Sequence, residues 1–483
     1  MDGDAFEHHL DSPQGRGHEP PRAAVGTAGG APCGDLVSVA LVLDGERVAD
    51  AGFEASGCGA AVAAGSAVVS LVRGRGLFDA ARVGTHEIAR ELGGLSAGKL
   101  HAAELAADAL HRALGVAARE RAALEPDPER TLVALSGGVD SAVAALLARR
   151  AGREVVAVTL ELWADEHNDG ARSCCSAQAV RGARSLAHGM GIGHLTLDLR
   201  AEFRADVVGP YLEDHGAGRT PNPCVRCNGH VRLDALVALA DRLGAAQLAT
   251  GHYARIADDG DGPLLRVAAD AAKDQSYMLC ALAPATLARL RFPLGELHKP
   301  TVRAIAAEAE LPVAGKPDSQ DLCFLAGTSR ESFLARHGGP RERAGELVDA
   351  RGRVLGRHRG HHNYTVGQRR GLGLGGGERL YVLATEPRAN RVVVGPRAAL
   401  AAGAIALERV TLARPGARVD RVKLRYRSEA QPCAPLPEAA AGRHAALALE
   451  LREPAYGVAP GQTACLMDGE LIVGWGTIGA GGS

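Results

Sequence analysis

Hydrophobic and polar positions first follow a strand-like pattern and then a helical one. The runs 36–43 and 48–53 alternate around an Asp-Gly pair, which is typical of a β-hairpin. Runs of helical period follow at 60–73, 86–93 and 99–114. This part of the chain is therefore expected to be a small α+β unit.

Two segments around this unit have loop-like composition. Residues 11–34 are rich in Gly, Pro and Ser, and residues 124–130 hold two prolines among charged residues. We expect the first to form an arm or loop and the second a linker.

Strand-like and helical segments alternate after the linker. Short apolar runs lie at 131–135, 155–160, 194–199 and 247–250. Helical runs lie between them, at 142–150, 176–190 and 230–243. Strands that alternate with helices of this length favour a doubly wound parallel sheet, in which ligands bind at the carboxyl ends of the strands.

Beyond residue 330 the helical period fades and short β-like runs take its place. They lie at 391–395, 404–411, 420–427 and 446–452, and they predict a terminal antiparallel barrel. The expected fold class is therefore α/β in a multi-domain chain. The predicted domains are a small α+β domain over 1–125, a doubly wound domain over 129–325, a small central domain over 326–395 and a β-barrel over 396–483.

Composition excludes several classes of protein. The chain has 483 residues, a length that suits about three globular domains. Its hydrophobic fraction of 46% is unlike that of a disordered chain. With 55 basic and 56 acidic residues it is not a globally basic nucleic-acid coater, although a local basic face remains open. No stretch approaches the roughly 20 apolar residues of a membrane span and the start lacks a signal-like apolar core, so we expect a cytoplasmic protein.

Arginine has almost replaced lysine in this chain. Only 5 of the 55 basic residues are lysines: Lys99, Lys273, Lys299, Lys316 and Lys423. An ammonium is a compact point charge, whereas a guanidinium is a planar fork, so the two cations are not interchangeable. The remaining lysines are therefore candidates for positions that need an ammonium.

A phosphate-binding loop is predicted over 135–141, Leu-Ser-Gly-Gly-Val-Asp-Ser, where the first strand of this alternation passes into its helix. Two glycines permit a tight turn that presents N–H donors, and the helix N-terminus adds a positive dipole end. The segment is not a Walker A motif. It resembles the PP-loop of ATP pyrophosphatases, which implies binding of ATP and release of pyrophosphate. The alternative is a Ser/Gly turn that only caps a helix.

Three cysteines in two later motifs suggest sulfur chemistry. Cys224 and Cys227 form a C-x-x-C in a Pro-rich loop, and Cys323 follows in the segment Asp-Ser-Gln-Asp-Leu-Cys-Phe. A thiolate becomes a good nucleophile when a cation or a C-x-x-C neighbour lowers its pKa, and Arg226 and Cys224 are candidates for that role beside Cys227.

With four further segments, these motifs resemble the tRNA-specific 2-thiouridylase family (MnmA/TrmU) over about 130–478. The segments are ATGHY (249–253), KDQSY (273–277), FPLGEL (292–297) and YTVGQRRGLG (364–373). The resemblance implies an ATP-dependent tRNA-uridine 2-sulfurtransferase that adenylates the 2-carbonyl of the wobble uridine and replaces AMP by sulfur from a protein persulfide. It also implies ATP and Mg²⁺ as ligands, the tRNA anticodon loop as substrate, and a cysteine desulfurase or sulfur-relay protein as donor.

The resemblance assigns roles residue by residue. It implies Cys227 as nucleophile, Cys323 as persulfide carrier, and a disulfide between them after sulfur release. The implied ATP contacts are Ala134, Leu135, Ser136, Gly137, Gly138, Val139, Asp140, Ser141, Leu160 and Gly251. The implied tRNA contacts are Lys273, Asp274, Gln275, His252, Arg425, Tyr426 and Gln462.

The chain departs from the family pattern at Cys224, where some members carry an Asp proposed as an acid or base. Three readings of Cys224, Cys227 and Cys323 therefore stay open: a persulfide relay, a four-iron cluster held by three thiolates, and a zinc site or plain packing. The other cysteines of this region are expected to be small buried residues: Cys174, Cys175, Cys280, Cys433 and Cys465.

Two basic segments are candidates for contact with RNA. Residues 351–370 hold six Arg, three His and no acid, and residues 421–428 alternate basic side chains as a strand would. Such segments suit phosphate contacts, and Tyr426 is expected to stack on a base. The alternative for each is a solvated charged face.

Motifs of the N-terminal part resemble the iron–sulfur scaffold family typified by NifU and IscU. They are APCGD (31–35), GCGA (57–60) and GKLH (98–101). Family members hold a cluster with three Cys beside an Asp, but Ala102 stands where the third Cys would follow His101. The candidate metal ligands are thus Cys33, Asp35, Cys58 and His101. A degenerate module that only docks a desulfurase is the alternative.

Three hypotheses for the whole chain follow. The leading one is an enzyme, a tRNA-uridine 2-sulfurtransferase fused to a scaffold-like domain. The others are a different PP-loop ligation or amidation, and an iron–sulfur carrier with an inactive ATPase.

Overall fold

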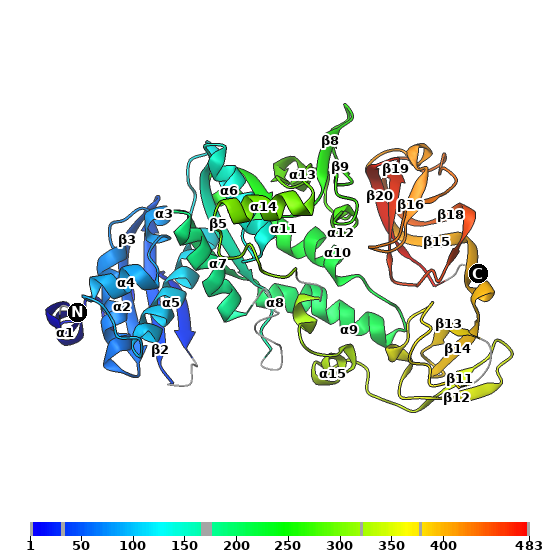
Figure 1. Ribbon diagram of the computed structural model, residues 1–483, viewed down its shortest axis with the longest axis horizontal. Coiled ribbons are helices and arrows are strands. Elements are labelled where there is room, and N and C mark those ends of the chain that lie inside the picture. The colour runs from blue at the N-terminus through cyan, green and yellow to red at the C-terminus, as the bar shows by residue number, and fades with distance from the viewer. Residues whose placement is uncertain (1–2, 30–33, 166–175, 319–321, 376–378, 481–483) are drawn as a thin grey trace. The chain divides into compact units, whose positions relative to one another are not determined.

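The computed structural model describes residues 3–29, 34–165, 176–318, 322–375 and 379–480. The chain divides into two units, and Figure 1 colours it by residue number. Unit one contains Met1–Arg200, Ala235–His252 and Arg289–Ala326, and unit two contains Ala201–Asp234, Tyr253–Ala288 and Gly327–Ser483. Within the described ranges, no helix is long and apolar enough to cross a membrane.

Alternating apolar positions fold the N-terminal part into an antiparallel sheet of order β1-β2-β3. The strands are β1 (Ala24–Gly29), β2 (Leu36–Asp44) and β3 (Arg47–Ser56). Gly45 between β2 and β3 has a φ of +58°, as the predicted Asp-Gly turn requires, so the hairpin is confirmed. The helices of this part are α1 (Gly3–Asp11), α2 (Gly59–Val72), α3 (Leu77–Ala80), α4 (Thr85–Glu91) and α5 (Leu100–Glu120).

Two of the loop predictions are partly wrong. The segment 11–34 contains β1, which pairs with β2 over its whole length. Its sequence AVGTAG has few β-branched residues, so pairing and packing rather than propensity make it a strand. The linker predicted over 124–130 ends early, because strand β4 already begins at Asp127.

The alternating strand-like segments form the predicted parallel sheet, with the order β10-β7-β4-β5-β6. Its strands are β4 (Asp127–Ala134), β5 (Glu154–Glu161), β6 (Gly193–Asp198), β7 (Ala245–Thr250) and β10 (Leu290–Arg291). Its helices are α6 (Val139–Arg150), α7 (Ala177–Gly189), α11 (Leu233–Arg242) and α14 (Lys299–Glu308). Strand β4 is central and its last five residues are buried, so its carboxyl end opens into the middle of one sheet edge.

Helix α5 packs against both sheets of unit one, since it contacts β1 and β2 of the antiparallel sheet and β6 of the parallel sheet. Two glycines permit this close approach. A Cβ atom at Gly26 of β1 would stand 2.2 Å from the Ala109 oxygen, and a Cβ atom at Gly115 would stand 1.8 Å from the Thr196 oxygen of β6. The edge strand of the parallel sheet is thereby covered by the N-terminal part of the chain.

Charged and histidine side chains hold α5 in this position. Arg112 donates two hydrogen bonds to the buried Glu161 at the end of β5, at 2.6 and 3.1 Å. Asp108 accepts a hydrogen bond of 2.7 Å from Arg181 of α7. The ring nitrogens of His111 lie 2.7 Å from the His194 oxygen and 2.9 Å from a second carbonyl oxygen. Burial holds the pKa of His111 well below its ordinary value.

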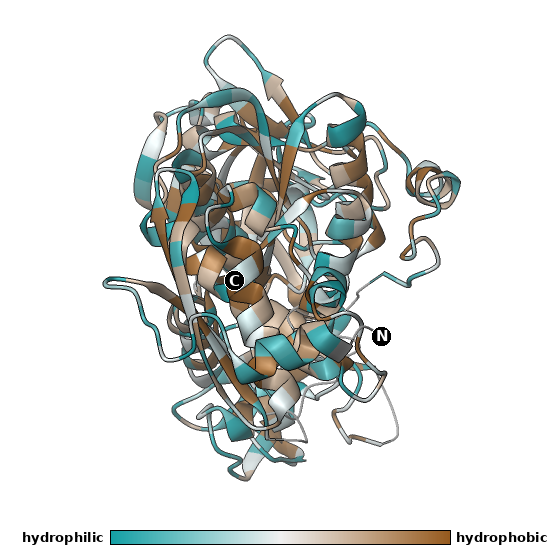
Figure 2. Cartoon of the chain, turned by 90° about the vertical axis from the view of Figure 1, so that its left-hand side faces the viewer, coloured by the Kyte–Doolittle hydropathy of each residue, from teal (hydrophilic) through white to brown (hydrophobic). Residues whose placement is uncertain are grey.

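Hydrophobic and polar residues alternate on the helices of unit one. Helix α7 shows this well, since its buried positions recur at helical spacing. Figure 2 displays the pattern as teal and brown bands along helices and strands. Amphipathic helices of this kind are what a parallel sheet needs on its faces.

Unit two combines short helices with two further sheets. Its first sheet has the order β12-β11-β14-β13, and the second is an eight-stranded antiparallel sheet that contains β15 to β20 together with β8 and β9. The helical elements between Arg200 and Arg336 are α8 (Arg200–Phe203), η1 (Arg204–Val208), α9 (Gly209–Gly216), α10 (Pro223–Cys227), η2 (Asn228–Arg232), α12 (Ser276–Leu279), α13 (Pro284–Arg289), η3 (Cys323–Leu325) and α15 (Arg330–Arg336), of which η3 lies in unit one.

The strands of unit two and its remaining short helices follow in chain order. They are β8 (Arg255–Asp258), β9 (Pro263–Arg266), β11 (Gly345–Val348), β12 (Val354–His358), η4 (His361–Asn363), β13 (Leu380–Glu386), β14 (Arg391–Pro396), η5 (Arg397–Leu400), β15 (Ala401–Leu412), η6 (Gly416–Arg418), β16 (Arg421–Lys423), β17 (Gln431–Pro432), β18 (Gly442–Tyr456), β19 (Thr463–Asp468) and β20 (Leu471–Ile478).

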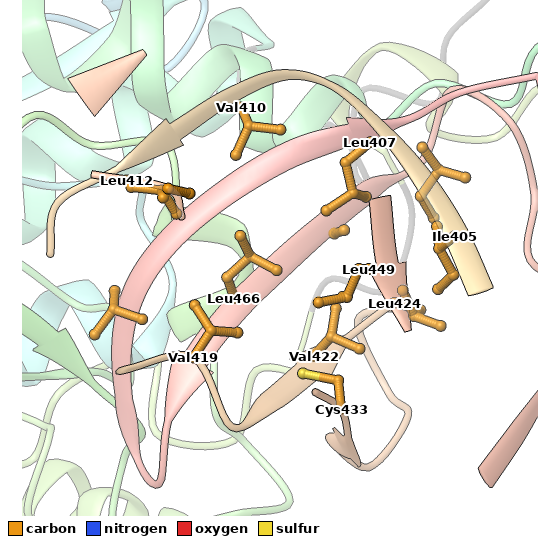
Figure 3. Close-up of a cluster of buried hydrophobic side chains, with 14 of the residues drawn as sticks. Ile405, Leu407, Val410, Leu412, Val419, Val422, Leu424, Cys433, Leu449 and Leu466 are labelled. Atoms are coloured by element: carbon orange, nitrogen blue, oxygen red, sulfur yellow. The ribbon is translucent and has the colours of Figure 1, made fainter. Parts of the chain in front are cut away.

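The eight-stranded sheet curls around an apolar core, as predicted for the C-terminal part. Inward-facing residues of β15, β16, β18 and β19 point toward one another in Figure 3, among them Leu407, Val422, Leu449 and Leu466. Burying a side chain of this kind stabilises the fold by about 1.5–3 kcal/mol. The predicted fold class, a multi-domain α/β chain with a terminal antiparallel barrel-like sheet, is confirmed.

The strand predicted over 420–427 is wrong beyond Lys423. Strand β16 pairs with β19 only from Arg421 to Lys423. The chain then turns, and the Ser428 N–H and hydroxyl both donate to the Arg425 oxygen. Arg425 and Tyr426 therefore stand in a turn rather than on one face of a strand.

The basic segment 351–370 is less uniform than its sequence suggests. Strand β12 and helix η4 run through it, and its three histidines, His358, His361 and His362, are buried. Burial lowers the pKa of His358 and His362, so their rings do not add to a cationic face at neutral pH. The exposed cations of this segment are its arginines: Arg351, Arg353, Arg357, Arg359, Arg369 and Arg370.

Candidate active site

The phosphate loop, residues 135–141, connects the central strand β4 to helix α6. The Leu135 N–H donates to the Val158 oxygen at 2.9 Å, and the Thr159 hydroxyl donates to the Leu135 oxygen at 2.6 Å, both from β5. The Ser141 hydroxyl lies 3.1 Å from both the Ser136 nitrogen and the Ser136 hydroxyl. The loop is thus tied at both ends, with the first turn of α6 beneath it, whose N–H groups have no partner inside the helix.

Two glycines shape this loop. Gly137 has a φ of +69°, which a residue with a side chain rarely adopts. Gly251, just after β7, comes from far along the sequence, and a Cβ atom there would stand 2.6 Å from the Ser141 nitrogen. The structure therefore brings Gly251 to the predicted loop. Leu160 lies buried in the neighbouring strand β5.

Charged side chains from α14 and the segment after it reach the same loop. The Lys299 ammonium donates to both carboxylate oxygens of Asp140, at 2.7 and 2.8 Å, and lies 2.9 Å from an Asp318 oxygen. The Lys316 ammonium donates to the Gly137 oxygen at 2.9 Å. Neither lysine is among the predicted ATP contacts, although the rarity of lysine had marked both as candidates for positions that need an ammonium.

The C-x-x-C stands at the start of helix α10. The Asn222 side chain caps this helix by accepting the Val225 N–H at 3.2 Å, and Pro223 takes the first helical position. Cys224 is half-buried and Cys227 is buried, with 8% of its surface exposed. Cys224 lies in the first turn of α10, and Cys227 is the last residue of this helix. Arg226, the cation expected beside Cys227, donates its Nε–H to the Asp206 oxygen.

Two of the predicted tRNA contacts in unit two, Gln462 and Tyr426, interact with this helix or with the loop before it. The Gln462 side chain donates to the Thr220 oxygen at 3.0 Å and so supports the loop before Cys224. Tyr426 interacts electrostatically with Cys224 and Lys273, and burial raises the pKa of its hydroxyl. Tyr426 is thus connected to Cys224 and to Lys273, and Gln462 to the loop before Cys224, although these residues come from separate stretches of the sequence.

Arg425 links two motifs that the sequence places far apart. It donates to the Gly457 oxygen, and a Cβ atom at Gly367 of the YTVGQRRGLG segment would stand 3.3 Å from its Nη2. Gly367 has a φ of +86°. The positive φ favours glycine at this position, and a side chain there would also crowd the arginine.

Asp274 and Gln275, also predicted to contact tRNA, have structural partners in this chain. The buried Asp274 accepts the Ala268 N–H at 3.0 Å and the Ser276 hydroxyl at 2.9 Å, and it pairs with Lys423 at 3.2 Å. The Gln275 side chain accepts the Tyr253 N–H at 3.0 Å. Such bonds fix the segment that carries Lys273.

Cys323 and His252 belong to unit one, whereas Cys224 and Cys227 belong to unit two. Cys323 begins the short helix η3 and is half-buried. His252 follows Gly251, and its Nδ1 lies 2.8 Å from the Thr250 hydroxyl. The meeting of the three thiols stays a prediction.

Three of the four candidate metal ligands of the N-terminal part converge. The ligand atoms of Asp35, Cys58 and His101 all lie within 4.8 Å of one another. The buried Asp35 accepts the Cys58 N–H at 2.9 Å and lies 3.1 Å from both the Cys58 sulfur and His101 Nε2. His101 Nδ1 lies 2.9 Å from the Gly98 oxygen. A carbonyl oxygen at this position orients the imidazole so that its other nitrogen can bind a metal. Cys33 lies outside the described residues, and Ala102 is fully buried.

Cys280, Cys433 and Cys465 are buried, as predicted for packing residues. Cys174 and Cys175 lie outside the described residues. Burial raises the pKa of Cys433 to about 11. No pattern in the sequence indicated that Cys465 meets Cys280. A hydrogen bond between these thiols, together with burial, holds the pKa of Cys465 well above its ordinary value.

Four family models match successive parts of the chain. They are described as a NifU-like N terminal domain (3–122), a tRNA methyl transferase HUP domain (129–327), a tRNA methyl transferase PRC-barrel domain (331–396) and an aminomethyltransferase beta-barrel domain (412–478).

Relatives match either the whole chain or its larger part. The chain is 44% identical to the bifunctional protein NifU/MnmA of Rubrobacter xylanophilus, over 97% of both chains. It is 44% identical to the tRNA-specific 2-thiouridylase MnmA of Acidithiobacillus ferrooxidans, over 72% of this chain and 98% of that one. It is 46% identical to the protein of the same name from Methylobacterium radiotolerans, over 73% and 94%.

Proposed function

The chain belongs to the family of bifunctional NifU/MnmA proteins, and from this premise we propose that it is a tRNA 2-thiouridylase that activates the wobble uridine with ATP and receives sulfur as a protein persulfide. The observation that carries the proposal is the phosphate loop, held at the carboxyl end of the central strand β4 and closed by Gly251 against Ser141. Backbone donors at such a loop suit the phosphates of ATP.

In the first step the uridine 2-oxygen attacks the α-phosphorus of ATP. An O–P bond forms, the bond to the bridging oxygen breaks, and pyrophosphate leaves with that electron pair. The loop orients the phosphates and the donors of α6 stabilise their charge. Mg²⁺ would neutralise phosphate charge, but the Lys299 ammonium engages both oxygens of Asp140, the carboxylate at the first turn of α6, so the ion would be held by the phosphates and not by this residue.

In the second step the terminal sulfur of a persulfide on Cys323 attacks C2 of the adenylated base, and AMP leaves with the oxygen. The thiolate of Cys227 attacks the remaining sulfur of Cys323, the persulfide bond breaks, and a Cys227–Cys323 disulfide forms. A thiol reductant then restores both thiols. Cys224, at the capped start of α10, is a candidate to lower the pKa of Cys227.

We propose that the tRNA anticodon loop contacts Lys273, Arg425, Tyr426 and Gln462, with His252 as a further contact. Unpaired loop bases leave their stack at low cost, which suits a reaction at the 2-carbonyl. Lys273 and Arg425 supply cations for phosphates, and Tyr426 supplies a stacking surface. Asp274 and Gln275 act through the backbone of this segment.

The N-terminal domain is proposed to bring sulfur or iron to the reaction. Asp35, Cys58 and His101 supply oxygen, sulfur and nitrogen ligands within a few ångströms, and this donor set fits iron or an iron–sulfur cluster, with Cys33 as the fourth candidate. A cluster would supply exchangeable sulfide and iron. A cysteine desulfurase or sulfur-relay protein is the expected donor, and a reducing cytoplasm the expected compartment.

The decisive test measures pyrophosphate release and 2-thiouridine formation separately. Cys227→Ser should abolish 2-thiouridine while tRNA-dependent pyrophosphate release continues, because activation needs the loop and not the thiol. Cys433→Ala, in the barrel core, serves as the matched cysteine control. Thiolation by Cys227→Ser at the parent rate would contradict the assignment of the nucleophile.

Two alternatives have their own readouts. If a four-iron cluster on Cys224, Cys227 and Cys323 carries the sulfur, anaerobically purified protein should contain iron and sulfide that Cys224→Ala loses and Cys58→Ala keeps. If the chain is an iron–sulfur carrier with an inactive ATPase, no tRNA-dependent pyrophosphate release should be detected in the parent protein.

A further inference from the structure

Two of the chain's five lysines lie at the phosphate loop. Lys316 donates to the Gly137 oxygen, and Lys299 bridges Asp140 and Asp318. Because only 5 of the chain's 55 basic residues are lysines, a basic residue at any one position would be expected to be arginine. A compact ammonium with three donors fits against a tight loop where a planar guanidinium does not.

The two lysines differ in their surroundings. Lys316 is exposed, and Gly137 is its hydrogen-bond partner among the described residues. Lys299 is buried, with 7% of its surface exposed, and its ammonium pairs with two carboxylates. Lys316 is therefore free to give its other donors to a ligand, whereas Lys299 is committed to joining two parts of the chain.

Lys299 joins the loop to the segment that carries Lys316. Asp140 belongs to α6 and Asp318 lies two residues beyond Lys316, so the ammonium of Lys299 fastens the 316–318 segment onto the loop. Arg303 adds a second bond to Asp318, at 2.8 Å. The side chains beside the loop carry a net positive charge, which suits an anion. The cations are Lys299, Lys316 and Arg303, and the carboxylates are Asp140 and Asp318.

We propose that Lys316 binds the β- and γ-phosphates of ATP and holds the pyrophosphate as it leaves, and that Lys299 is the positioning residue that keeps Lys316 at the loop. This inference rests on the proposed function. When the bond between the α-phosphorus and its bridging oxygen breaks, negative charge grows on the pyrophosphate, and an adjacent ammonium stabilises that charge. Lys316 contributes no covalent step.

Inorganic pyrophosphate and AMP, each titrated calorimetrically into the full chain, separate this role from general binding. Lys316→Ala should weaken the binding of pyrophosphate at least about tenfold, because a charge-assisted hydrogen bond is lost, and should leave the affinity for AMP unchanged. The KM for ATP should rise by a similar factor. Since Lys316 is exposed, its removal leaves the core intact.

Arg149→Ala is the matched control, because it removes one positive charge at the exposed C-terminal end of the same helix α6. It should leave pyrophosphate binding unchanged. Lys316→Arg should recover only part of the lost affinity. Equal pyrophosphate affinity in Lys316→Ala and the parent would overturn the inference alone, whereas a parent that binds neither ATP nor pyrophosphate would overturn the proposed function with it.

Asp318→Asn tests the positioning role by the sign of its effect. Charge alone predicts tighter pyrophosphate binding, since a carboxylate near an anion has been neutralised. If Lys299 holds the segment through Asp318, binding weakens instead, because Lys316 is no longer kept at the loop. Tighter binding in Asp318→Asn would overturn the role given to Lys299.

Discussion

Replacing Gly115 by Ala should separate the N-terminal part of the chain from the parallel sheet. Gly115 lies on the flank of α5 that faces β6, where a Cβ atom would stand 1.8 Å from the Thr196 oxygen. That distance is 1.6 Å short of the 3.4 Å at which ordinary contact begins. A backbone oxygen within a strand cannot rotate away, so the helix and the strand must move apart.

The net cost follows from two opposing effects. Overpacking of this kind costs about 1–3 kcal/mol, and more where backbone must move. Alanine in place of glycine inside a helix returns about 1 kcal/mol through helix propensity. We therefore expect Gly115→Ala to lower the free energy of unfolding by up to about 2 kcal/mol. Part of that loss should come from the Arg112–Glu161 pair, which the same movement stretches.

Gly182→Ala is the matched control, because Gly182 lies in helix α7 with nothing within 4 Å of a Cβ atom. It should stabilise the chain by up to about 1 kcal/mol. Urea unfolding gives both energies, and limited proteolysis near residues 121–126 reports whether the N-terminal part has loosened. If Gly115→Ala is as stable as Gly182→Ala and equally resistant to protease, the packing of α5 on β6 does not exist in solution.

Three more predictions concern other parts of the molecule. Burial lowers the pKa values of His111, His188 and His194, so the unfolded chain takes up protons that the folded chain refuses; the free energy of unfolding should therefore fall as pH drops below about 6.5, and a flat profile between pH 7 and 5 would contradict this. Cys58→Ala should weaken Co²⁺ binding at least about tenfold, as read from the thiolate charge-transfer absorption, and an unchanged spectrum would exclude Cys58 as a ligand. Tyr426→Ala should weaken tRNA binding by about 1–3 kcal/mol while Tyr426→Phe retains it, because stacking needs the ring and not the hydroxyl; equal loss in both variants would refute the stacking role.

The parallel sheet could be predicted because its signals are local. Each strand is a short apolar run and each helix has its own period, so β4, α6 and β5 could be placed to within a few residues. Strand β1 could not, because its residues are small and its structure depends on pairing with β2 and packing against α5. The strand predicted over 420–427 fails for the opposite reason: its alternation is local, but β19 offers partners only up to Lys423.

The candidate site shows the same division. The loop over 135–141 is one continuous motif and was predicted whole. Lys316 and Lys299 follow it by more than 150 residues, and neither stands in a motif, so only their scarcity marked them. The same holds for the thiols of Cys280 and Cys465, which are separated along the chain and brought together by the packing of β19.

A helix wedged between two sheets has a consequence for how sulfur could travel. Because both flanks of α5 are packed, we expect the N-terminal domain to stay fixed on the parallel sheet and not to move as a flexibly tethered domain. Sulfur or a cluster held at Cys58 would then have to be transferred by a separate carrier molecule. Lengthening the connection around residues 121–126 should therefore not speed sulfur delivery.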